Sequence, residues 1–414
     1  MSPNTERWTV VSLLFLGVLI SYIDRGNLSV AAVPIMRELR LSPAAIGVAL
    51  SAFFWTYLVF QIPAAYLVDT CGLRWSYGIA FLIWSLASTA ICLVHSFPQL
   101  ICLRLLLGMS EAIVGPASVA YIQRHFNESE QGLPTGLYLS GMMLGPAIGS
   151  LLGSILLERV GWRPLFLATG LVGCLWLWPW LLATSTDDKG SSDLTTKYSL
   201  APKKRLDRVS LLLSPVTWGV TVCTLFYSYF WFFCLTWMPS YLVMSRHFSY
   251  SKMGRFMALP LVTMALSSLA FGALADRLAK QTEALLVRKC FVIVGFILGC
   301  SILLLTRVKS SEDVFIVLMF SFMAMGLASA NFWTITELIS PKAAIAVVVS
   351  YQNTIATAGG AVAALITGIL IRDTGDFRMA VGLAGGSLLI AAGATFILIR
   401  ETGVDKFRRL LASS

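Results

Sequence analysis

Long apolar runs recur twelve times along this sequence and limit its possible folds more than any other feature. A helix needs about 20 apolar residues to cross the hydrocarbon core of a bilayer. The runs are too long and continuous for the short, alternating strands of a membrane β-barrel. The sequence therefore predicts an all-α membrane protein with twelve transmembrane helices. The predicted spans are 8–35, 44–68, 76–95, 99–123, 132–157, 162–183, 214–243, 251–275, 289–306, 314–339, 343–371 and 378–400.

Composition and charge agree with this class of protein. Of the 414 residues, 57% are hydrophobic and only 13% are charged, whereas about 25% are charged in a soluble domain. A net charge of +10 would suit a nucleic-acid partner, but Lys and Arg favour the segments predicted to be cytoplasmic. We read the K-K-R run at 203–205 as such a topology signal and expect no nucleic-acid partner. We expect a multi-pass protein of the cell inner membrane, surrounded by lipid, with both termini cytoplasmic.

Cysteine and histidine usage argues against an enzyme. The eight cysteines lie mostly inside the apolar runs without a C-x-x-C pair, so they are expected to be small core residues rather than disulfides or metal ligands. The three histidines are far apart and show no metal-ligand spacing. We therefore expect no metal, no cofactor and no catalytic site. The first run is too long for a cleavable signal peptide and contains Asp24 and Arg25, so it is predicted to be an uncleaved span.

A single long polar stretch divides the chain in two. It is rich in Ser, Thr and charged residues, as linkers are, and six apolar runs lie on each side of it. This predicts two pseudo-symmetric six-helix bundles. The predicted segments are an N-terminal bundle at 1–183, a basic cytoplasmic linker at 184–213, a C-terminal bundle at 214–400 and a cytoplasmic tail at 401–414.

A short repeat supports this division. The chain reads A-Y-L-V-D-T-C-G-L-R after the second run and G-A-L-A-D-R-L-A-K after the eighth. Each copy has a small residue four positions before an aspartate and basic residues after it. Asp69 and Arg74 belong to the first copy, and Asp276 and Arg277 to the second. Such a repeat indicates two related halves.

Four ionisable residues lie well inside the predicted spans, where such residues are rare and mostly functional. They are Asp24, Arg25, Arg104 and Glu111. Arg104 and Glu111 are seven residues apart, about two turns or ~10.5 Å along one helix face. Asp24 and Arg25 project about 100° apart on a helix, so they need not pair with each other. We therefore consider an arrangement with Asp24 facing the fourth span and Arg25 facing the cavity.

The chemistry of these groups suggests a role for each. A poorly hydrated bundle disfavours a charged carboxyl and a nearby arginine favours it, so Asp24 and Glu111 suit reversible proton binding. Arg25 stays charged and offers a planar fork to an anionic substrate. An alternative is a purely structural network in which Asp24 pairs with Arg104, or Arg25 with Glu111. Arg104 is placed nearer one end of its span, which favours a structural or gating role.

Aromatic and amide side chains complete the predicted substrate site. They can donate hydrogen bonds to the hydroxyls of a polyol, although an aromatic residue also suits core packing and an amide also suits a helix–helix hydrogen bond. The predicted substrate-binding residues are Arg25, Tyr22, Tyr57, Gln61, Asn331, Trp333 and Asn353. A G-x-x-x-G pattern at 141–149 indicates close helix packing.

Six plus six spans, a basic central linker and the repeated aspartate loops resemble the major facilitator superfamily. Within it, the chain resembles the anion:cation symporter family through Y-I-D-R-G-N-L-S-V-A, W-T-Y-L-V-F-Q-I-P, R-L-L-L-G-M-S-E-A-I-V-G-P and L-T-W-M-P-S-Y-L. The resemblance covers nearly the whole chain. It implies two halves that rock around a central cavity and a proton-coupled uptake of an organic anion, such as a sugar acid, by alternating access. The proton gradient replaces a cofactor, and we expect a functional monomer.

The resemblance also implies roles for individual residues. Arg25 matches the substrate-binding arginine, and Asp24 and Glu111 match the protonatable pair. Tyr22, Tyr57 and Asn353 match cavity-lining positions. The residues that match the loops holding one state closed are Asp69, Arg74, Asp276 and Arg277.

Two departures from the family pattern bear on this interpretation. The first loop has Ala65 and Thr70 where the pattern has Gly and Arg, which bears on gating. Met142 stands where sugar-acid members carry a glutamine. A methionine cannot make the hydrogen bonds that an amide makes to substrate hydroxyls. A proton-driven exporter of drugs or organic cations remains the alternative, because the Gly145-Pro146 pair also occurs in antiporters of the superfamily. Arg25 argues against that alternative.

Overall fold

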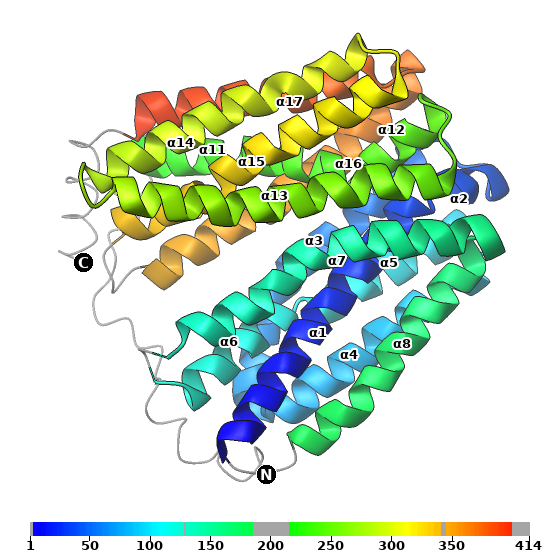
Figure 1. The fold of residues 1–414 in the computed structure, drawn as a ribbon. Helices are drawn as coiled ribbons and strands as arrows, with labels where there is room; N and C mark the ends of the chain where they lie inside the picture. Colours follow the sequence, from blue (N-terminus) through cyan, green and yellow to red (C-terminus); the bar gives the residue numbers. More distant parts are fainter. Residues whose placement is uncertain (1–2, 128–129, 185–214, 341–344, 400–414) are drawn as a thin grey trace. The chain divides into compact units, whose positions relative to one another are not determined.

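The computed structural model describes residues 3–127, 130–184, 215–340 and 345–399. Throughout these ranges the regular structure is helical and no strand is present (Figure 1). Twelve helical segments of the described chain are long and apolar enough to cross a membrane. The predicted all-α class and the twelve spans are therefore confirmed.

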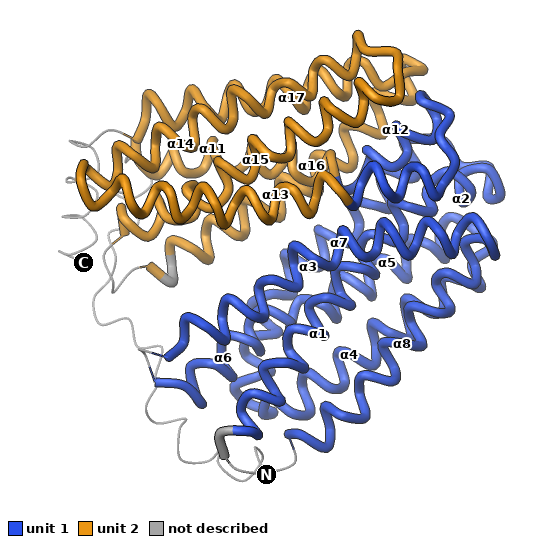
Figure 2. The backbone as a smooth tube through the Cα atoms, in the orientation of Figure 1, with its two compact units in different colours: residues 1–200, 235–258 blue, residues 201–234, 259–414 orange. Residues whose placement is uncertain are grey.

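The chain forms two compact units (Figure 2). One contains residues 1–200 and 235–258, and the other contains 201–234 and 259–414. Residues 235–258 thus group with the N-terminal unit, although they follow the polar stretch in sequence. The predicted linker 184–213, apart from Thr184, and the tail 401–414 lie outside the described residues.

The helices of the first unit are α1 (Pro3–Val30), α2 (Ala32–Glu38), α3 (Pro43–Cys71), α4 (Leu73–Ala90), α5 (Phe97–Glu111), α6 (Val114–His125), α7 (Gly132–Val160), α8 (Trp162–Ala183) and α12 (Met238–Met244), with the short 3-10 helix η1 (Ile91–Leu93). Those of the second are α11 (Pro215–Thr236), α14 (Ala284–Gly299), η3 (Cys300–Thr306), α15 (Ser311–Ile339), α16 (Ile345–Thr374) and α17 (Arg378–Leu398). By the unit boundaries, α11 ends in the first unit, and α13 (Tyr250–Leu278) begins in it and continues in the second.

Three predicted spans are broken into two α-helices, and a proline lies near each break. Pro34, Pro116 and Pro239 lie shortly after the ends of α1, α5 and α11, near the start of the next helix. A proline lacks an N–H and its ring clashes with the carbonyl four residues earlier, which favours a break at these positions. The break after α5 comes directly behind Glu111. The sequence predicts the apolar runs correctly but not these breaks.

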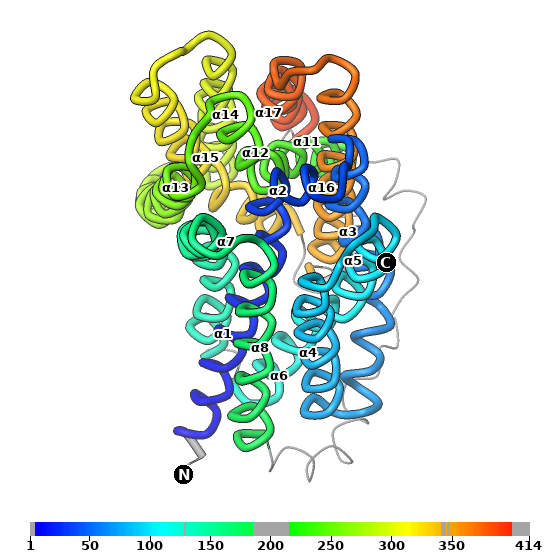
Figure 3. Tube along the Cα trace, turned by 90° about the vertical axis from the view of Figure 1, so that its right-hand side faces the viewer, coloured from blue at the N-terminus to red at the C-terminus, as the bar shows by residue number. Residues whose placement is uncertain are grey.

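Aromatic side chains form the core between α4 and α8. Phe81 stacks on Trp176 with ring centroids 3.8 Å apart, and Trp176 stacks on Trp180 at 5.1 Å. The Trp176 indole N–H donates to the carbonyl of Leu13 at 3.0 Å, which ties α8 to α1. Figure 3 shows α1 beside α8, and α4 beside α5. These contacts hold α1 at a fixed rotation within the unit.

Close packing of α1 on α7 depends on glycine. A Cβ atom at Gly145 would lie 2.6 Å from the Cβ of Tyr22, which no real side chain tolerates. Glycine here lets the two backbones approach, as the G-x-x-x-G pattern predicts. The approach places the Tyr22 turn of α1 against α7, and so positions the neighbouring charged residues.

Candidate functional site

Arg25 and Glu111 form an ion pair between α1 and α5. Arg25 Nε lies 2.7 Å from Glu111 Oε2. The Glu111 side chain is fully buried, whereas the Arg25 side chain keeps 14% of its surface exposed. This is one of the two pairings that the sequence left open. Glu111 uses the Nε side of the guanidinium, and a small part of the arginine side chain stays exposed.

Three aromatic rings surround the same guanidinium. The Arg25 carbon Cζ lies 4.5 Å from the ring centroid of Tyr22, 4.8 Å from that of Phe53 and 4.6 Å from that of Tyr57. Cation–π contacts at these distances stabilise a desolvated cation. Tyr22 and Tyr57 were predicted, whereas Phe53 was missed. Its position one helical turn before Tyr57 on α3 was the available signal.

Glu111 is the last residue of α5 and has one oxygen without a partner. Its Oε1 atom accepts no hydrogen bond of normal geometry from the described residues, although the Ser21 hydroxyl of α1 interacts with this carboxylate. A buried carboxylate with an unsatisfied oxygen is costly as an anion. Reversible protonation relieves this cost, so the position suits proton binding.

Arg104 ties α5 to α3. It is 2% exposed, and its Nε donates to the carbonyl of Ala49 at 3.3 Å. Its guanidinium also lies 5.2 Å from the ring centroid of Phe53, so this ring contacts both Arg104 and Arg25. The contacts agree with the structural role considered for Arg104. The alternative pairing of Arg104 with Asp24 does not occur among the ion pairs of the described residues.

Asp24 lies away from Arg25 and bonds to other helices. Its Oδ1 accepts from the Ser88 hydroxyl of α4 at 3.0 Å and from the Asn27 amide at 3.4 Å. The Asn27 amide also donates to Thr169 of α8 at 2.9 Å. The predicted arrangement, with Asp24 facing the fourth span, is corrected, because its hydrogen bonds go to the third span and to its own helix. The two neighbours in sequence are separated because their side chains leave α1 in different directions.

Other predicted side chains of the first unit lie near this site. Tyr22, Tyr57 and Met142 pack against one buried hydrophobic cluster, which also includes Tyr138 of α7. Tyr138 was not predicted. Gln61 lies on α3 one turn after Tyr57 and is half-buried.

The amides and the tryptophan predicted in the second unit differ in their surroundings. Asn331 is fully buried, and its Oδ1 accepts a hydrogen bond from Arg288 Nη1 at 2.7 Å. It thus makes a helix–helix hydrogen bond, the alternative to a substrate contact. Trp333 is half-buried beside Phe332. Asn353 is exposed on α16. The structure thus engages Asn331 in an internal bond and leaves Asn353 accessible.

The two repeated aspartates lie in the last turns of α3 and α13, not in loops, and they have different partners. Asp69 pairs with Arg124 at the end of α6 at 3.0 Å, whereas the Arg74 guanidinium lies over the ring of Trp75. In the second copy, Asp276 pairs with the buried Arg288 of α14. Arg277 is exposed. The aspartates therefore bind basic residues of other helices, and Arg288 and Arg124 were missed because they lie outside the repeat.

No group of three or more His, Cys, Asp or Glu residues in the described part of the chain is arranged to hold a metal ion. The polar site around Arg25 is built from one cation, one carboxylate and aromatic rings. Such a site can bind an anion and exchange a proton, whereas it offers no nucleophile–base pair for covalent chemistry.

Comparison with known proteins assigns this chain to a family. The model of the Major Facilitator Superfamily matches residues 14–364. The "Probable L-galactonate transporter" of Escherichia coli is 26% identical over 404 residues, covering 95% of this chain and 89% of that protein. The "Probable galactarate/D-glucarate transporter GudP" of Bacillus subtilis is 26% identical over 434 residues, covering 96% and 92%.

A solved structure has the same fold. It is a bacterial homolog of the human lysosomal transporter Spinster, in an inward-facing and occupied conformation, with a TM-score of 0.75 and 18% sequence identity. The match covers 98% of this chain and 97% of that one. The chain belongs to the Major Facilitator Superfamily and is a multi-pass membrane transporter, not an enzyme.

Proposed function

We propose that this chain is a secondary active transporter that couples uptake of an organic anion, a sugar acid or another carboxylate, to an inward proton gradient. The names of the galactonate and galactarate/glucarate relatives support this substrate class. In this proposal the protein works by alternating access as a monomer in the cell inner membrane, with both termini in the cytoplasm. The proton gradient is its only energy source.

The observation that carries the proposal is the Arg25–Glu111 pair. Its carboxylate is fully buried and its arginine is partly accessible. A substrate carboxylate and the Glu111 carboxylate are chemically alike, so both compete for the same guanidinium. Protonation of Glu111 weakens its hold on Arg25 and frees a donor for the substrate. Binding of the anion and binding of the proton therefore favour each other.

Asp24 supplies a second proposed proton site. It is 1% exposed, and its Oδ2 has no hydrogen-bond partner among the described residues. Because it bonds to Ser88 and Asn27 instead of Arg25, its protonation does not compete directly with the substrate. We propose that Asp24 acts through the packing of α1 and Glu111 acts at the substrate itself.

Transport in proteoliposomes tests the proposal. An imposed inward proton gradient should drive accumulation of a labelled sugar acid, drawn from a panel that includes galactonate, glucarate and aromatic acids. A sodium gradient of equal size serves as the comparison for the coupling ion, and cationic dyes test the export alternative. Outward movement of dyes without any anion uptake would overturn the proposal.

Two variants separate the assigned roles. Arg25→Ala should lower anion uptake at least 100-fold. Glu111→Gln should abolish gradient-driven accumulation while substrate exchange across the membrane continues, because glutamine cannot carry the proton. The matched control is Arg372→Ala, which removes an exposed arginine paired with its own neighbour Asp373. Full accumulation by Glu111→Gln would contradict its role.

A further inference from the structure

Tyr77 on α4 carries a buried hydroxyl group that packing alone does not explain. The residue is fully buried, and its ring centroid lies 4.8 Å from that of Trp180 and 5.5 Å from that of Trp176. Its hydroxyl has no hydrogen-bond partner in the part of the chain that the structure describes. A phenylalanine would keep these ring contacts without burying an unsatisfied polar group, which is costly. The hydroxyl therefore calls for a role beyond packing.

The Tyr77 hydroxyl lies against α1, where Gly17 makes room for it. A Cβ atom at Gly17 would be 2.6 Å from the Tyr77 oxygen, so any larger residue would displace the hydroxyl. The charge of Glu111 acts on this hydroxyl. The Tyr77 oxygen is thus held next to α1 and within the electrostatic field of the proposed proton site.

Gly17, Ser21 and Asp24 share one face of α1, because they are spaced by four and three residues. Ser21, in the middle, is fully buried. Its hydroxyl interacts with the Glu111 carboxylate, although neither Ser21 Oγ nor Glu111 Oε1 makes a hydrogen bond of normal geometry among the described residues. This face of α1 therefore brings the Tyr77 hydroxyl and Glu111 to neighbouring turns of one helix.

The gap between the Ser21 and Tyr77 hydroxyls suits one water molecule. Ser21 is one helical turn, about 6 Å, beyond Gly17 along α1, and the Cα–Cβ bonds of a helix tilt toward its N-terminus. The Ser21 side chain therefore leans toward the turn that the Tyr77 oxygen contacts. Two hydrogen bonds of about 2.8 Å, joined at one water, span about this distance. Such a water would have three polar partners, Ser21, Tyr77 and Glu111 Oε1, and about three are typical of a buried water.

Two contacts show in which direction this polar line runs. The Tyr77 hydroxyl lies at Gly17, and Ser88, further along α4, donates to Asp24, further along α1, at 3.0 Å. The two helices therefore run the same way, and Tyr77 lies nearer to their first residues than Ser88 does. In the proposed topology those first residues face the cytoplasm, so Tyr77 lies on the cytoplasmic side of Glu111.

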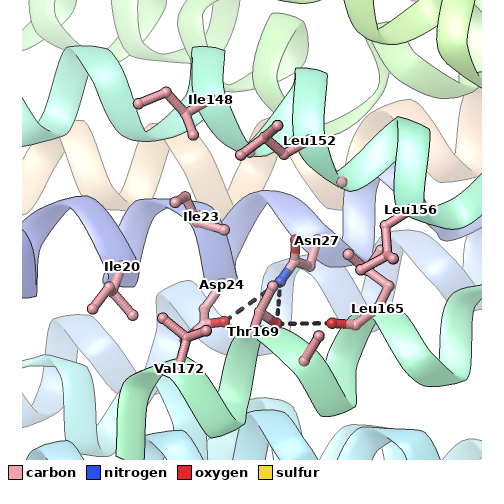
Figure 4. Close-up of a pocket in the computed structure, with 13 residues that line it drawn as sticks. Ile20, Ile23, Asp24, Asn27, Ile148, Leu152, Leu156, Leu165, Thr169 and Val172 are labelled. Carbon is pink, nitrogen blue, oxygen red and sulfur yellow. Dashed lines mark hydrogen bonds between the residues drawn. The ribbon is translucent and has the colours of Figure 1, made fainter. Parts of the chain in front are cut away.

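Another face of α1 is apolar instead. Figure 4 shows the pocket between α1, α7 and α8, whose wall is mostly aliphatic and includes Ile20 and Ile23 of α1. The Asn27 amide on that side is bonded to both Asp24 and Thr169. An aliphatic wall cannot pass a proton by hydrogen bonding, so the face toward Tyr77 is the one that can carry it.

We propose that Tyr77 is a proton-relay residue, which connects Glu111 through one water molecule to the cytoplasmic end of the first unit. Ser21 holds this water in place. As Glu111 releases its proton to the water, the water passes one of its own protons to the Tyr77 oxygen, and Tyr77 releases its hydroxyl proton toward the start of α4. The water and Tyr77 end the step neutral, and Glu111 ends it as a carboxylate. The reverse order loads Glu111. This inference rests on the proposed proton binding by Glu111.

A pH jump from a photolysed caged proton tests the relay on the full chain in nanodiscs, without any substrate. The infrared carbonyl band of protonated Glu111, identified as the band missing from Glu111→Gln, reports proton arrival. Tyr77→Phe should slow the rise of this band about tenfold or more. It should leave the final amplitude unchanged, because the relay sets the rate and not the equilibrium. An unchanged rate would overturn the relay. Absence of any such band from the unmodified chain at every pH would instead overturn the proposed function at Glu111, and the relay with it.

Ser21→Ala and Ser85→Ala form a matched pair. Both remove a fully buried serine hydroxyl that lacks a hydrogen bond of normal geometry among the described residues. The Ser85 hydroxyl lies against Gly173 of α8 rather than against α1. Ser21→Ala should therefore slow proton arrival, whereas Ser85→Ala should match the unmodified chain. Equal slowing by both would overturn the relay, because it would show a general response to the loss of a buried hydroxyl.

Gly17→Ala tests the geometry of the relay. The added methyl group displaces the Tyr77 oxygen, so this variant should also slow proton arrival. Combined with Tyr77→Phe it should add no further slowing, since the hydroxyl that it displaces is already absent. Independent, multiplying effects of the two changes would overturn the relay.

Discussion

Arg25 in the first unit and Arg288 in the second are both arginines held among membrane-spanning helices, but their carboxylate partners lie in different surroundings. The Glu111 side chain is fully buried, whereas the Asp276 side chain is 67% exposed. Water can stabilise the Asp276 carboxylate when Arg288 moves away. Glu111 has no such alternative, so its charge depends on Arg25.

This difference separates a switch from a permanent connection. A buried carboxylate that loses its arginine is under pressure to bind a proton, and a buried arginine that loses a buried carboxylate attracts another anion. Arg288 instead joins Asp276 and the buried Asn331, and thereby connects α13, α14 and α15. The first pair suits a change of state during transport, and the second suits a lasting link between helices.

Removing Arg25 is expected to have the largest effect on stability. Arg25→Ala should lower the free energy of unfolding by about 3–5 kcal/mol, because it leaves the Glu111 carboxylate buried without a counter-charge. Denaturant unfolding in mild detergent, followed by tryptophan fluorescence, measures the change. Glu111→Gln in the same chain should restore most of the loss. If Arg25→Ala alone were as stable as the unmodified chain at a pH high enough to keep Glu111 ionised, the switch interpretation would fail.

Removing Arg288 is expected to cost less, about 1–3 kcal/mol. Asp276 becomes hydrated, and the main penalty is the Asn331 Oδ1 atom left buried without a donor. The same unfolding measurement applies, and Asn331→Leu as a second change should recover part of the loss. Arg277→Ala, at an exposed neighbouring arginine, is the control and should stay within about 0.5 kcal/mol. A larger loss for Arg288→Ala than for Arg25→Ala would reverse the comparison.

The Asp69–Arg124 pair should contribute less to stability than either the Arg25–Glu111 or the Arg288–Asp276 pair. The side chains are 56% and 28% exposed, so Asp69→Asn should change the free energy of unfolding by less than about 1 kcal/mol. The difference should shrink further when unfolding is repeated at high salt, because salt screens exposed charges. A loss that is large and independent of salt would indicate that this pair behaves like a buried one.

The smallest expected effect is a pH dependence at Glu38, outside the membrane-spanning segments. Hydrogen bonds from the Arg163 guanidinium and the Trp162 indole lower the pKa of Glu38 below its ordinary value of 4.5. Its contribution to stability is therefore present above pH 4.5 and is lost as the pH falls through the lowered pKa. Thermal unfolding from about pH 6 to pH 3.5 should show a slightly steeper loss in the unmodified chain than in Glu38→Gln. Parallel pH profiles would contradict this contribution.

Local features made much of the fold predictable. Twelve apolar runs correspond to twelve spans because length and hydropathy act within each helix. The breaks near Pro34, Pro116 and Pro239 were missed, although their prolines were visible, because proline is tolerated inside other helices of this chain, such as Pro63 in α3 and Pro146 in α7. Whether a proline ends a helix depends on the packing around it.

In the candidate site, too, some features are visible in the sequence and others depend on packing. Asp24, Arg25, Arg104 and Glu111 stand out in the sequence because charge is rare within apolar runs. The neighbours that complete their environment, such as Ser88 and Thr169, are ordinary residues of membrane helices and carry no distinguishing pattern. Their importance arises only from proximity in space.

The sequence by itself determined the spans, and it determined that Asp24 and Arg25 leave α1 about 100° apart, because both follow from apolar length and helical geometry. Only the tertiary structure decided that Arg25 binds Glu111 while Asp24 turns to Ser88 and Asn27. Those partners depend on how α1 is rotated against α4, α5, α7 and α8. That rotation results from packing contacts between residues far apart in the chain, including the approach of Gly145 to Tyr22.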